Sequence, residues 1–117
     1  MIATAKLRYL GVSAQKTRLV VDQLRGKNVN DALAILRYSR KLVAKDVQKL
    51  VQSAVANAQQ KDPSIDIDRL FVARAQVDNA PPMKRARAQS MGRIFPVIKR
   101  ACHVTVALDV PSKEERE

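Results

Sequence analysis

Apolar residues recur at intervals of three and four between residues 43 and 58, with mostly polar residues between them. The apolar positions are Val43, Val47, Leu50, Val51, Ala54, Val55 and Ala58. This spacing predicts an amphipathic helix that supplies much of the core, with Ser39 as its N-cap. Its second half, residues 53–58, has small side chains, which indicate either close approach of a neighbouring backbone or simple helix propensity.

Two shorter helices are predicted upstream. Ser13 is a suitable N-cap for residues 14–24, and Gly26 can adopt the left-handed conformation that ends a helix. Asn30 is a suitable N-cap for a second helix through residues 32–36, whose apolar positions again follow a helical period.

Three other segments alternate with a period of two, which predicts β-strands. Residues 2–10 form the first, with Lys6 and Arg8 on one side of the strand. The second begins at Ile65 and, past a bulge near residues 69–70, has its inward positions at Phe71, Ala73, Ala75 and Val77. The third has one apolar face, made by Cys102, Val104, Val106, Leu108 and Val110. Helices and strands together indicate an α+β fold.

The segment between the last two strands, at about residues 78–103, is predicted to form a long β-hairpin. Turn character is confined to Gln89-Ser90-Met91-Gly92, so the tip is placed there. About ten residues on each side, at ~3.3 Å per residue, project roughly 30 to 35 Å from the body. The hairpin tolerates three prolines because both of its strands are edges: Pro81, Pro82 and Pro96.

The charge distribution suggests what the hairpin binds. Lysine and arginine total 22 against 11 acidic residues, a net charge of +11. One basic zone lies at the N-terminus and contains Lys6, Arg8, Lys16, Arg18, Arg25 and Lys27. The other lies in the hairpin, contains no acid, and consists of Lys84, Arg85, Arg87, Arg93, Lys99 and Arg100. An isolated hairpin is marginal in water, so we expect nucleic-acid phosphates to order it.

Other function classes have little support. No apolar run approaches the ~18 to 20 residues of a membrane-spanning helix, and the N-terminus lacks a signal peptide's apolar region, so we expect a cytoplasmic protein without a membrane partner. Cys102 and His103 are adjacent in a strand and therefore point to opposite faces, which excludes a nucleophile-and-base pair. His103 is expected on the outer face of the sheet, where it can contact phosphate. We expect no enzyme, metal site or cofactor.

Two other classes of binding protein stay open at this stage. A DNA-bending architectural protein also uses a basic β-arm with prolines, usually as a dimer. A module that binds membranes or acidic proteins ranks last. We expect residues 1–110 to form a single domain and residues 111–117 to form a disordered tail, because the tail has no apolar residue apart from Pro111.

Several motifs resemble the large-subunit ribosomal protein twenty-two family. Residues 13–20, Ser-Ala-Gln-Lys-Thr-Arg-Leu-Val, followed by Leu-Arg-Gly-Lys at 24–27, resemble that family's opening signature. Further matches follow in the family's order at residues 30–36, 53–58, 83–85, 92–93, 99–100 and 103–106. The resemblance covers roughly residues 5 to 110. It implies three helices on a small three-stranded antiparallel sheet, with a long basic hairpin protruding from it.

The resemblance also implies a function. Such a protein is a structural component of the large ribosomal subunit, a monomer within it, whose body and hairpin bind and link segments of ribosomal RNA. Its other partners are neighbouring ribosomal proteins and, at the hairpin tip, the nascent polypeptide in the exit tunnel. The residues expected near the tunnel are Met83, Gln89, Ser90, Met91 and Gly92.

One stretch of the hairpin departs from the family's pattern. Residues 88–91 are Ala-Gln-Ser-Met, where members of the family usually carry Pro-Arg-Ala-Lys, so two tip charges are missing. We expect anchoring by the flanking cations to be retained and the effect of the tip on a nascent chain to differ.

Overall fold

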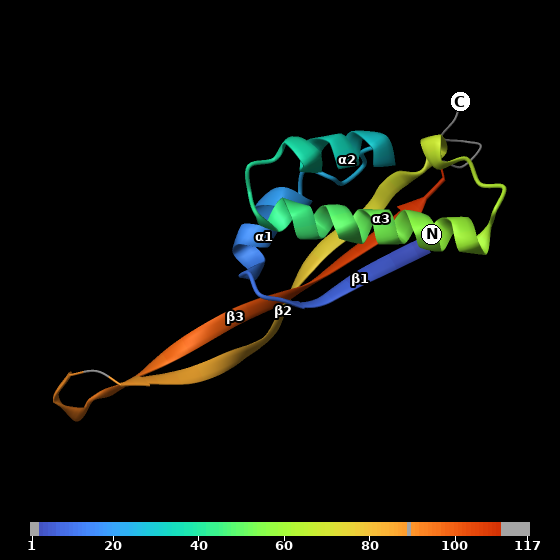
Figure 1. Ribbon diagram of the computed structural model, residues 1–117. Helices are drawn as coiled ribbons and strands as arrows, with labels where there is room; N and C mark the ends of the chain where they lie inside the picture. The colour runs from blue at the N-terminus through green and yellow to red at the C-terminus, as the bar shows by residue number, and fades with distance from the viewer. Residues whose placement is uncertain (1–2, 89, 111–117) are drawn as a thin grey trace.

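The computed structural model describes residues 3–88 and 90–110. Its three-stranded antiparallel sheet has the order β1-β3-β2, and three helices lie over one face of it (Figure 1). The elements are β1 (Ala3–Leu10), α1 (Ala14–Val21), α2 (Val29–Tyr38), α3 (Val43–Lys61), β2 (Phe71–Ala88) and β3 (Ile94–Asp109). The α+β architecture is thus confirmed. The predicted tail at 111–117 and Gln89 of the predicted tip lie outside the described residues.

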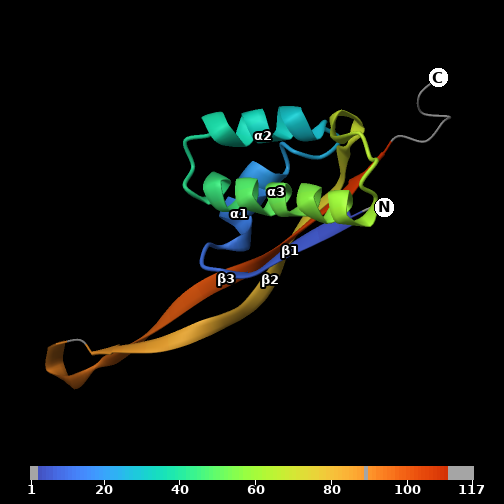
Figure 2. The same ribbon diagram turned by 45° about the vertical axis from the view of Figure 1, so that its right-hand side comes forward.

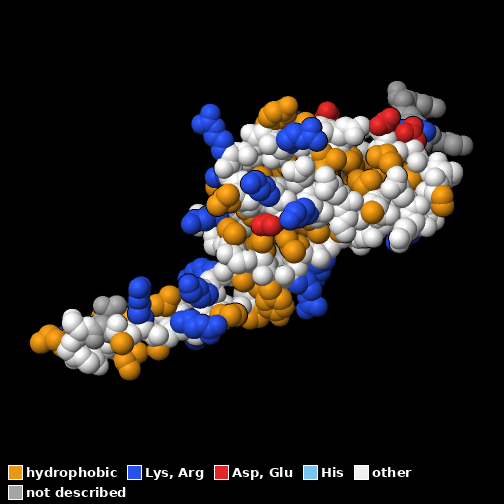
Figure 3. All heavy atoms as spheres, viewed as in Figure 1, with side chains coloured by type: hydrophobic (Ala, Val, Ile, Leu, Met, Phe, Trp, Pro, Cys, Tyr) orange, Lys and Arg blue, Asp and Glu red, His pale blue; other side chains and the backbone are white. Residues whose placement is uncertain are grey.

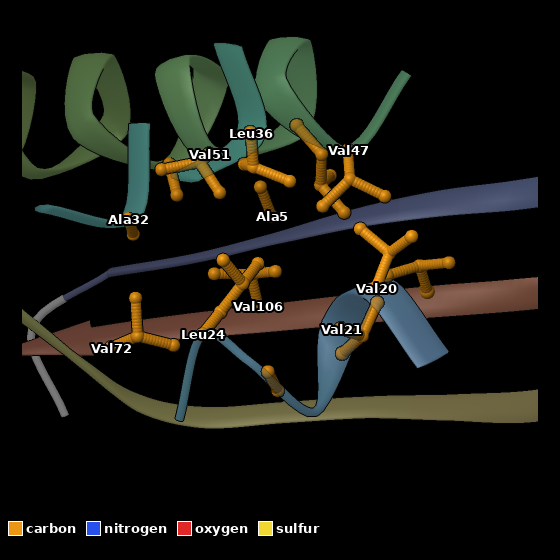
Figure 4. Packing of buried hydrophobic residues seen from close by; sticks show 14 of the residues in the cluster. Ala5, Val20, Val21, Leu24, Ala32, Leu36, Val47, Val51, Val72 and Val106 are labelled. Carbon is orange, nitrogen blue, oxygen red and sulfur yellow. The ribbon is translucent and has the colours of Figure 1, made fainter. Parts of the chain in front are cut away.

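The hydrophobic core lies between the helices and the sheet. Figure 4 shows Val47 and Val51 of α3 pointing toward the strands, where Val106 of β3 is also buried. In the second half of α3, Ala54 and Ala58 are completely buried, and the neighbouring Asn57 donates a hydrogen bond from Nδ2 to the carbonyl of Thr4 at 3.0 Å. This contact favours the close-approach interpretation of the small residues, because a larger inward side chain would separate α3 from β1.

The start of the first helix is as predicted, and its end is not. Ser13 is the N-cap of α1, and its hydroxyl accepts a hydrogen bond from the backbone N–H of Lys16 at 3.5 Å. The helix ends at Val21 rather than Leu24, because the chain continues through turns to Gly26, which has a φ of 76°. That positive φ is the conformation expected for a glycine after a helix.

The predicted N-caps of the other two helices are wrong. Asn28, not Asn30, caps α2: its Oδ1 accepts the Asn30 N–H at 2.9 Å, and its Nδ2 donates to the carbonyl of Asp68 at 2.6 Å. Ser39 is the C-cap of α2 and takes an extended conformation. A turn then separates it from α3, which begins at Val43 without a side-chain cap.

The beginning of the second strand also differs from the prediction. Residues 67–69 form a 3₁₀ turn in which Ile67 is partly buried against the core, so the alternation there is not that of a strand. The bulge lies between Val72 and Arg74 rather than at residues 69–70. Ala73 is the extra residue of this bulge. The inward positions before it are therefore Leu70 and Val72, and the prediction of Phe71 and Ala73 was wrong. After the bulge, Ala75 and Val77 point inward as predicted.

Beyond the body, β2 and β3 continue as a paired hairpin, and the molecule measures 69 × 26 × 21 Å (Figures 1 and 2). Burial ends at Ala80 on β2 and resumes at Cys102 on β3. We call residues 81–88 and 90–100 the arm, and residues 3–80 and 101–110 the body. The register shifts between Ala80 and Met83, so Pro81 and Pro82 lie in a bulge, where their missing N–H groups leave no gap in the ladder.

Candidate nucleic-acid interface

The predicted cations of the body are all exposed, but two of them also hold the fold. Arg18 donates from Nη2 to the carbonyl of Val77 at 3.0 Å, and Arg25 donates from Nε to the carbonyl of Ala75 at 2.7 Å. Arg25 also pairs with the carboxylate of Asp22. The two carbonyls lie on the outer edge of β2, so these arginines cover an edge strand as well as presenting charge. The other cations of this zone are Lys6, Arg8, Lys16 and Lys27.

The two basic zones meet where the arm leaves the body. A cleft of about 530 Å³ lies between the start of α1 and the root of the arm, and both Arg18 and Arg100 line it. A second hollow beside it, of about 520 Å³, is lined by Lys16 and Lys99 as well as Arg100. Cations from the N-terminal zone therefore face cations from the hairpin. This convergence was not predicted, because it depends on how the hairpin crosses α1.

The two faces of the arm differ in charge. Directly paired residues of an antiparallel ladder share a face, so the pairs Arg87–Phe95, Arg85–Val97 and Met83–Lys99 lie on one side. We call this side the cationic face. Four of its members, Arg85, Arg87, Val97 and Lys99, line a shallow groove of about 280 Å³. The paired residues of the opposite face are Lys84 with Ile98, Ala86 with Pro96 and Ala88 with Ile94, so these three pairs contain one cation where the three pairs of the cationic face contain three.

The arm has no partner for these charges within itself. Residues 81–100 contain no aspartate or glutamate. Every described residue of the arm is exposed except Val97, which is half-buried. Figure 3 shows the blue lysine and arginine side chains along the arm with no acidic side chain on it, whereas acidic side chains appear on the body. The arm is therefore a cationic rod that is open to solvent along its length.

The described part of the tip is a tight turn at Ser90–Gly92. Met91 and Gly92 have φ values of 66° and 73°, and the Met91 side chain is 93% exposed. Arg93 follows directly and is exposed as well. The turn therefore presents one long apolar side chain at the farthest point from the body.

The structure assigns Cys102 and His103 to different faces, as the alternation predicted. Cys102 is completely buried, with its Sγ 3.5 Å from Oγ1 of Thr17. His103 lies on the outer face, where its Nδ1 accepts the backbone N–H of Tyr9 at 3.0 Å. In residues 3–88 and 90–110, no helix is both long and apolar enough to cross a membrane. The same residues contain no group of three or more potential metal ligands among histidine, cysteine, aspartate and glutamate.

Comparison with known proteins identifies the family. The family model described as ribosomal protein L22p/L17e matches residues 5–109 of the chain. The chain belongs to this ribosomal protein family. It is 51% identical over 108 residues to the large ribosomal subunit protein uL22 of Geobacter sulfurreducens, covering 92% of this chain and 96% of the relative. Identity to the protein of the same name from Geobacter metallireducens is 53%, over 92% of this chain and 97% of the relative.

Membership of the L22p/L17e family confirms the resemblance seen in the motifs of residues 13–27 and 83–106. The family is structural and not enzymatic, which confirms the prediction that the chain is not an enzyme. The individual RNA-binding residues are the subject of the proposal that follows.

Proposed function

We propose that this chain is a structural protein of the large ribosomal subunit that binds ribosomal RNA through its body and arm and links separate RNA segments during assembly. Its partners are then the large-subunit RNA, neighbouring ribosomal proteins and the nascent polypeptide, and it acts as a monomer on the cytoplasmic ribosome. The names of the relatives, each a large ribosomal subunit protein, support this assignment.

The observation that carries the proposal is the arm. Its six cations are exposed, its sequence contains no acid, and none of its described residues is fully buried. A two-stranded ribbon of this kind gains little from folding alone. Binding to phosphates supplies what the ribbon lacks, because each neutralised phosphate releases condensed counterions. The residues assigned to this contact are Lys84, Arg85, Arg87, Arg93, Lys99 and Arg100, and His103 lies on the sheet surface near their root.

The body supplies a second anchor. Lys6, Arg8 and Lys16 are exposed, and Arg18 and Arg25 keep part of their donor capacity while they cover the edge of β2. Arg18 lines the cleft at the root of the arm with Arg100, and Lys16 lines the neighbouring hollow with Arg100, so one RNA backbone that enters them contacts both basic zones. A protein that holds RNA at the cleft and again along the arm links two RNA segments.

The tip is assigned to the exit tunnel. A 69 Å molecule with a slender arm can rest its body on an RNA surface and place Met91 deep inside it. The tip residues Ser90, Met91 and Gly92 then lie nearest the nascent chain; Gln89, predicted with them, lies outside the described residues. The prediction was wrong for Met83, which pairs with Lys99 at the root of the arm, because the arm begins its pairing there and turns only at Ser90. Met91, in place of a cation, gives the tip an apolar contact where the family usually has charge.

Salt dependence tests the proposal. If about eight phosphates are neutralised, the logarithm of the affinity for large-subunit RNA should fall with the logarithm of salt concentration at a slope of about −6 to −7. Duplex DNA of equal length serves as the competitor. A slope near zero contradicts RNA binding by these cations, and equal affinity for duplex DNA, together with a dimeric protein in sedimentation, supports the DNA-bending alternative instead.

A further inference from the structure

A small apolar pocket lies on the surface where the arm joins the body. Its volume is about 410 Å³, within the range of ligand sites. It is lined by Tyr9, Gly11, Pro81, Pro82, Met83, Lys99, Arg100 and Ala101. Figure 3 shows hydrophobic side chains gathered on the underside of the molecule at this junction. The lining thus combines an aromatic ring and apolar groups with two cations and no acid.

Two irregularities of the sheet create this pocket. On β1 the register shifts between Leu7 and Leu10, and on β2 it shifts between Ala80 and Met83. Both shifts lie next to the same part of β3, because Leu10 pairs with Cys102 and Met83 pairs with Lys99. Bulges turn side chains out of the regular pleat and commonly lie beside functional sites. Here they turn residues of both edge strands toward one hollow.

Tyr9 is held in an unusual conformation at this hollow. Its φ is 58°, in the left-handed region that bulky side chains rarely adopt. Three contacts hold it: its N–H donates to His103 Nδ1 at 3.0 Å, its ring meets the His103 ring edge-on at 4.7 Å, and the Arg8 guanidinium lies 5.9 Å from its centroid. Yet 59% of the residue is exposed. Strained backbone kept in place around an exposed ring is typical of ligand-binding sites.

We infer that this pocket holds one unstacked nucleobase of the bound RNA, with its ring against Tyr9 and its neighbouring phosphates at Lys99 and Arg100. The inference rests on the proposed function and names a contact within it. Single-stranded RNA is recognised by stacking its bases on aromatic side chains, while cations bind the backbone. The lining of the pocket contains both an aromatic ring, Tyr9, and two cations, Lys99 and Arg100. A protein with so few aromatic residues then uses one stacked base to fix its position on RNA, not to read sequence.

The test compares variants of the full chain for binding to large-subunit ribosomal RNA. Tyr9→Gly removes the ring and also relieves the positive φ, so its thermal midpoint should not fall. Its affinity should fall at least about fivefold, the lower end of the effect of removing a stacking residue. The salt slope should stay the same, because the ring carries no charge. Tyr9→Phe should bind as the unaltered chain does, and Tyr38→Ala, which removes another exposed tyrosine, should have no effect.

Lys99→Gln tests the phosphate contact separately from the stacking contact. It removes one charge, so it should make the salt slope shallower by about 1. Ultraviolet crosslinking of the complex should attach a nucleotide to the peptide that contains Tyr9. A Tyr9→Gly chain that binds RNA as tightly as the original, or a crosslink from Tyr9 to another protein in assembled subunits, overturns the inference. If instead the unaltered chain binds RNA without salt dependence, the proposed function itself fails, so the two failures are distinguishable.

Discussion

The strands β2 and β3 run through two regions that differ in almost every physical respect. In the body, alternate residues such as Val72 and Val106 are completely buried under the helices. In the arm, the same two strands keep their pairing register from Met83–Lys99 to Ala88–Ile94 but bury none of the described residues. The two strands are paired in both regions, so the main difference lies in burial, which is the main source of folding free energy.

The open edges of the strands differ in the same way. In the body, the outer edge of β2 is covered by the backbone of residues 26–29, which bonds to Leu70 and Val72, and further along by the side chains of Arg25 and Arg18. Unpaired edges of this kind invite association with other chains unless they are covered. In the arm, the edges carry cations instead. The comparison teaches that the body is folded by its own side chains, whereas the arm depends on an external anion.

Removing the arm separates the two regions most sharply. We expect a chain in which Asn-Gly replaces residues 83–98, and so lacks four cations, to lose two to three orders of magnitude in RNA affinity at physiological salt, with a salt slope shallower by about 3. Its free energy of unfolding should change by less than about 1 kcal/mol, because none of the described residues in the removed segment is buried. Filter binding and urea denaturation measure the two quantities. A large loss of stability would show that the arm supports the body.

Truncation of a side chain in the core, unlike removal of the arm, should lower the free energy of unfolding. Leu24 is completely buried, and Leu24→Ala should lower the free energy of unfolding by about 2 to 5 kcal/mol through lost burial and a cavity. The matched truncation in the arm, Ile98→Ala, should change it by no more than about 0.5 kcal/mol, because Ile98 is 47% exposed. Equal losses at the two positions, measured by urea denaturation, would contradict the contrast between body and arm.

Charge on the arm should matter more than equal charge elsewhere. The double variant Arg85→Gln and Arg87→Gln removes two charges from the cationic face, so the salt slope should become shallower by about 1.5 and the affinity should fall roughly tenfold or more. Lys45→Gln with Lys49→Gln removes the same charge from exposed positions of α3. That control should bind RNA almost as the original does. Similar losses in both double variants would mean that only net charge is sensed.

A smaller effect is expected from the arginines that cover the edge of β2. Arg25→Gln removes the hydrogen bond to the Ala75 carbonyl and should lower the free energy of unfolding by up to about 1 kcal/mol. The ion pair with Asp22 adds little, because both side chains are about half exposed. Arg87→Gln on the arm should leave stability unchanged. Thermal or urea unfolding of the two variants decides whether body cations and arm cations have different tasks.

Regular periodicity made much of the fold predictable. The run of apolar residues in 43–58 and the alternation from Cys102 to Leu108 each reflect one continuous buried face, and both elements lie where they were expected. Errors arose where contacts between distant parts of the chain decided the outcome. Asn28 and Asn30 are equally good caps by residue type, and the side chains of both bond to Asp68, which is about 40 residues away in the sequence: Asn28 to its carbonyl and Asn30 to its carboxylate. The bulge at Ala73 leaves no mark in the local pattern.

The candidate site was predictable to a similar extent. A basic segment without acids is visible in the sequence, so the arm's cations were found directly. The meeting of Arg18 and Lys16 with Arg100, in two neighbouring hollows, was not predicted, because Arg100 is far from the other two residues along the chain. The sequence also did not predict that Arg18 and Arg25 cover the edge of β2 as well as presenting charge. Their hydrogen-bond partners are backbone carbonyls, which every residue type has.

Hydrogen exchange of the isolated full chain, followed by the same measurement on its complex with large-subunit RNA, tests the central claim most directly. The account predicts that amides of the body, such as those of Val72 and Val106, are protected in both states. Amides of residues 83–88 and of 94, 95 and 97–99 should exchange rapidly in the free chain, even at high ionic strength, and become protected in the complex. Arm amides that are as protected as the body in the free protein at high salt would contradict it.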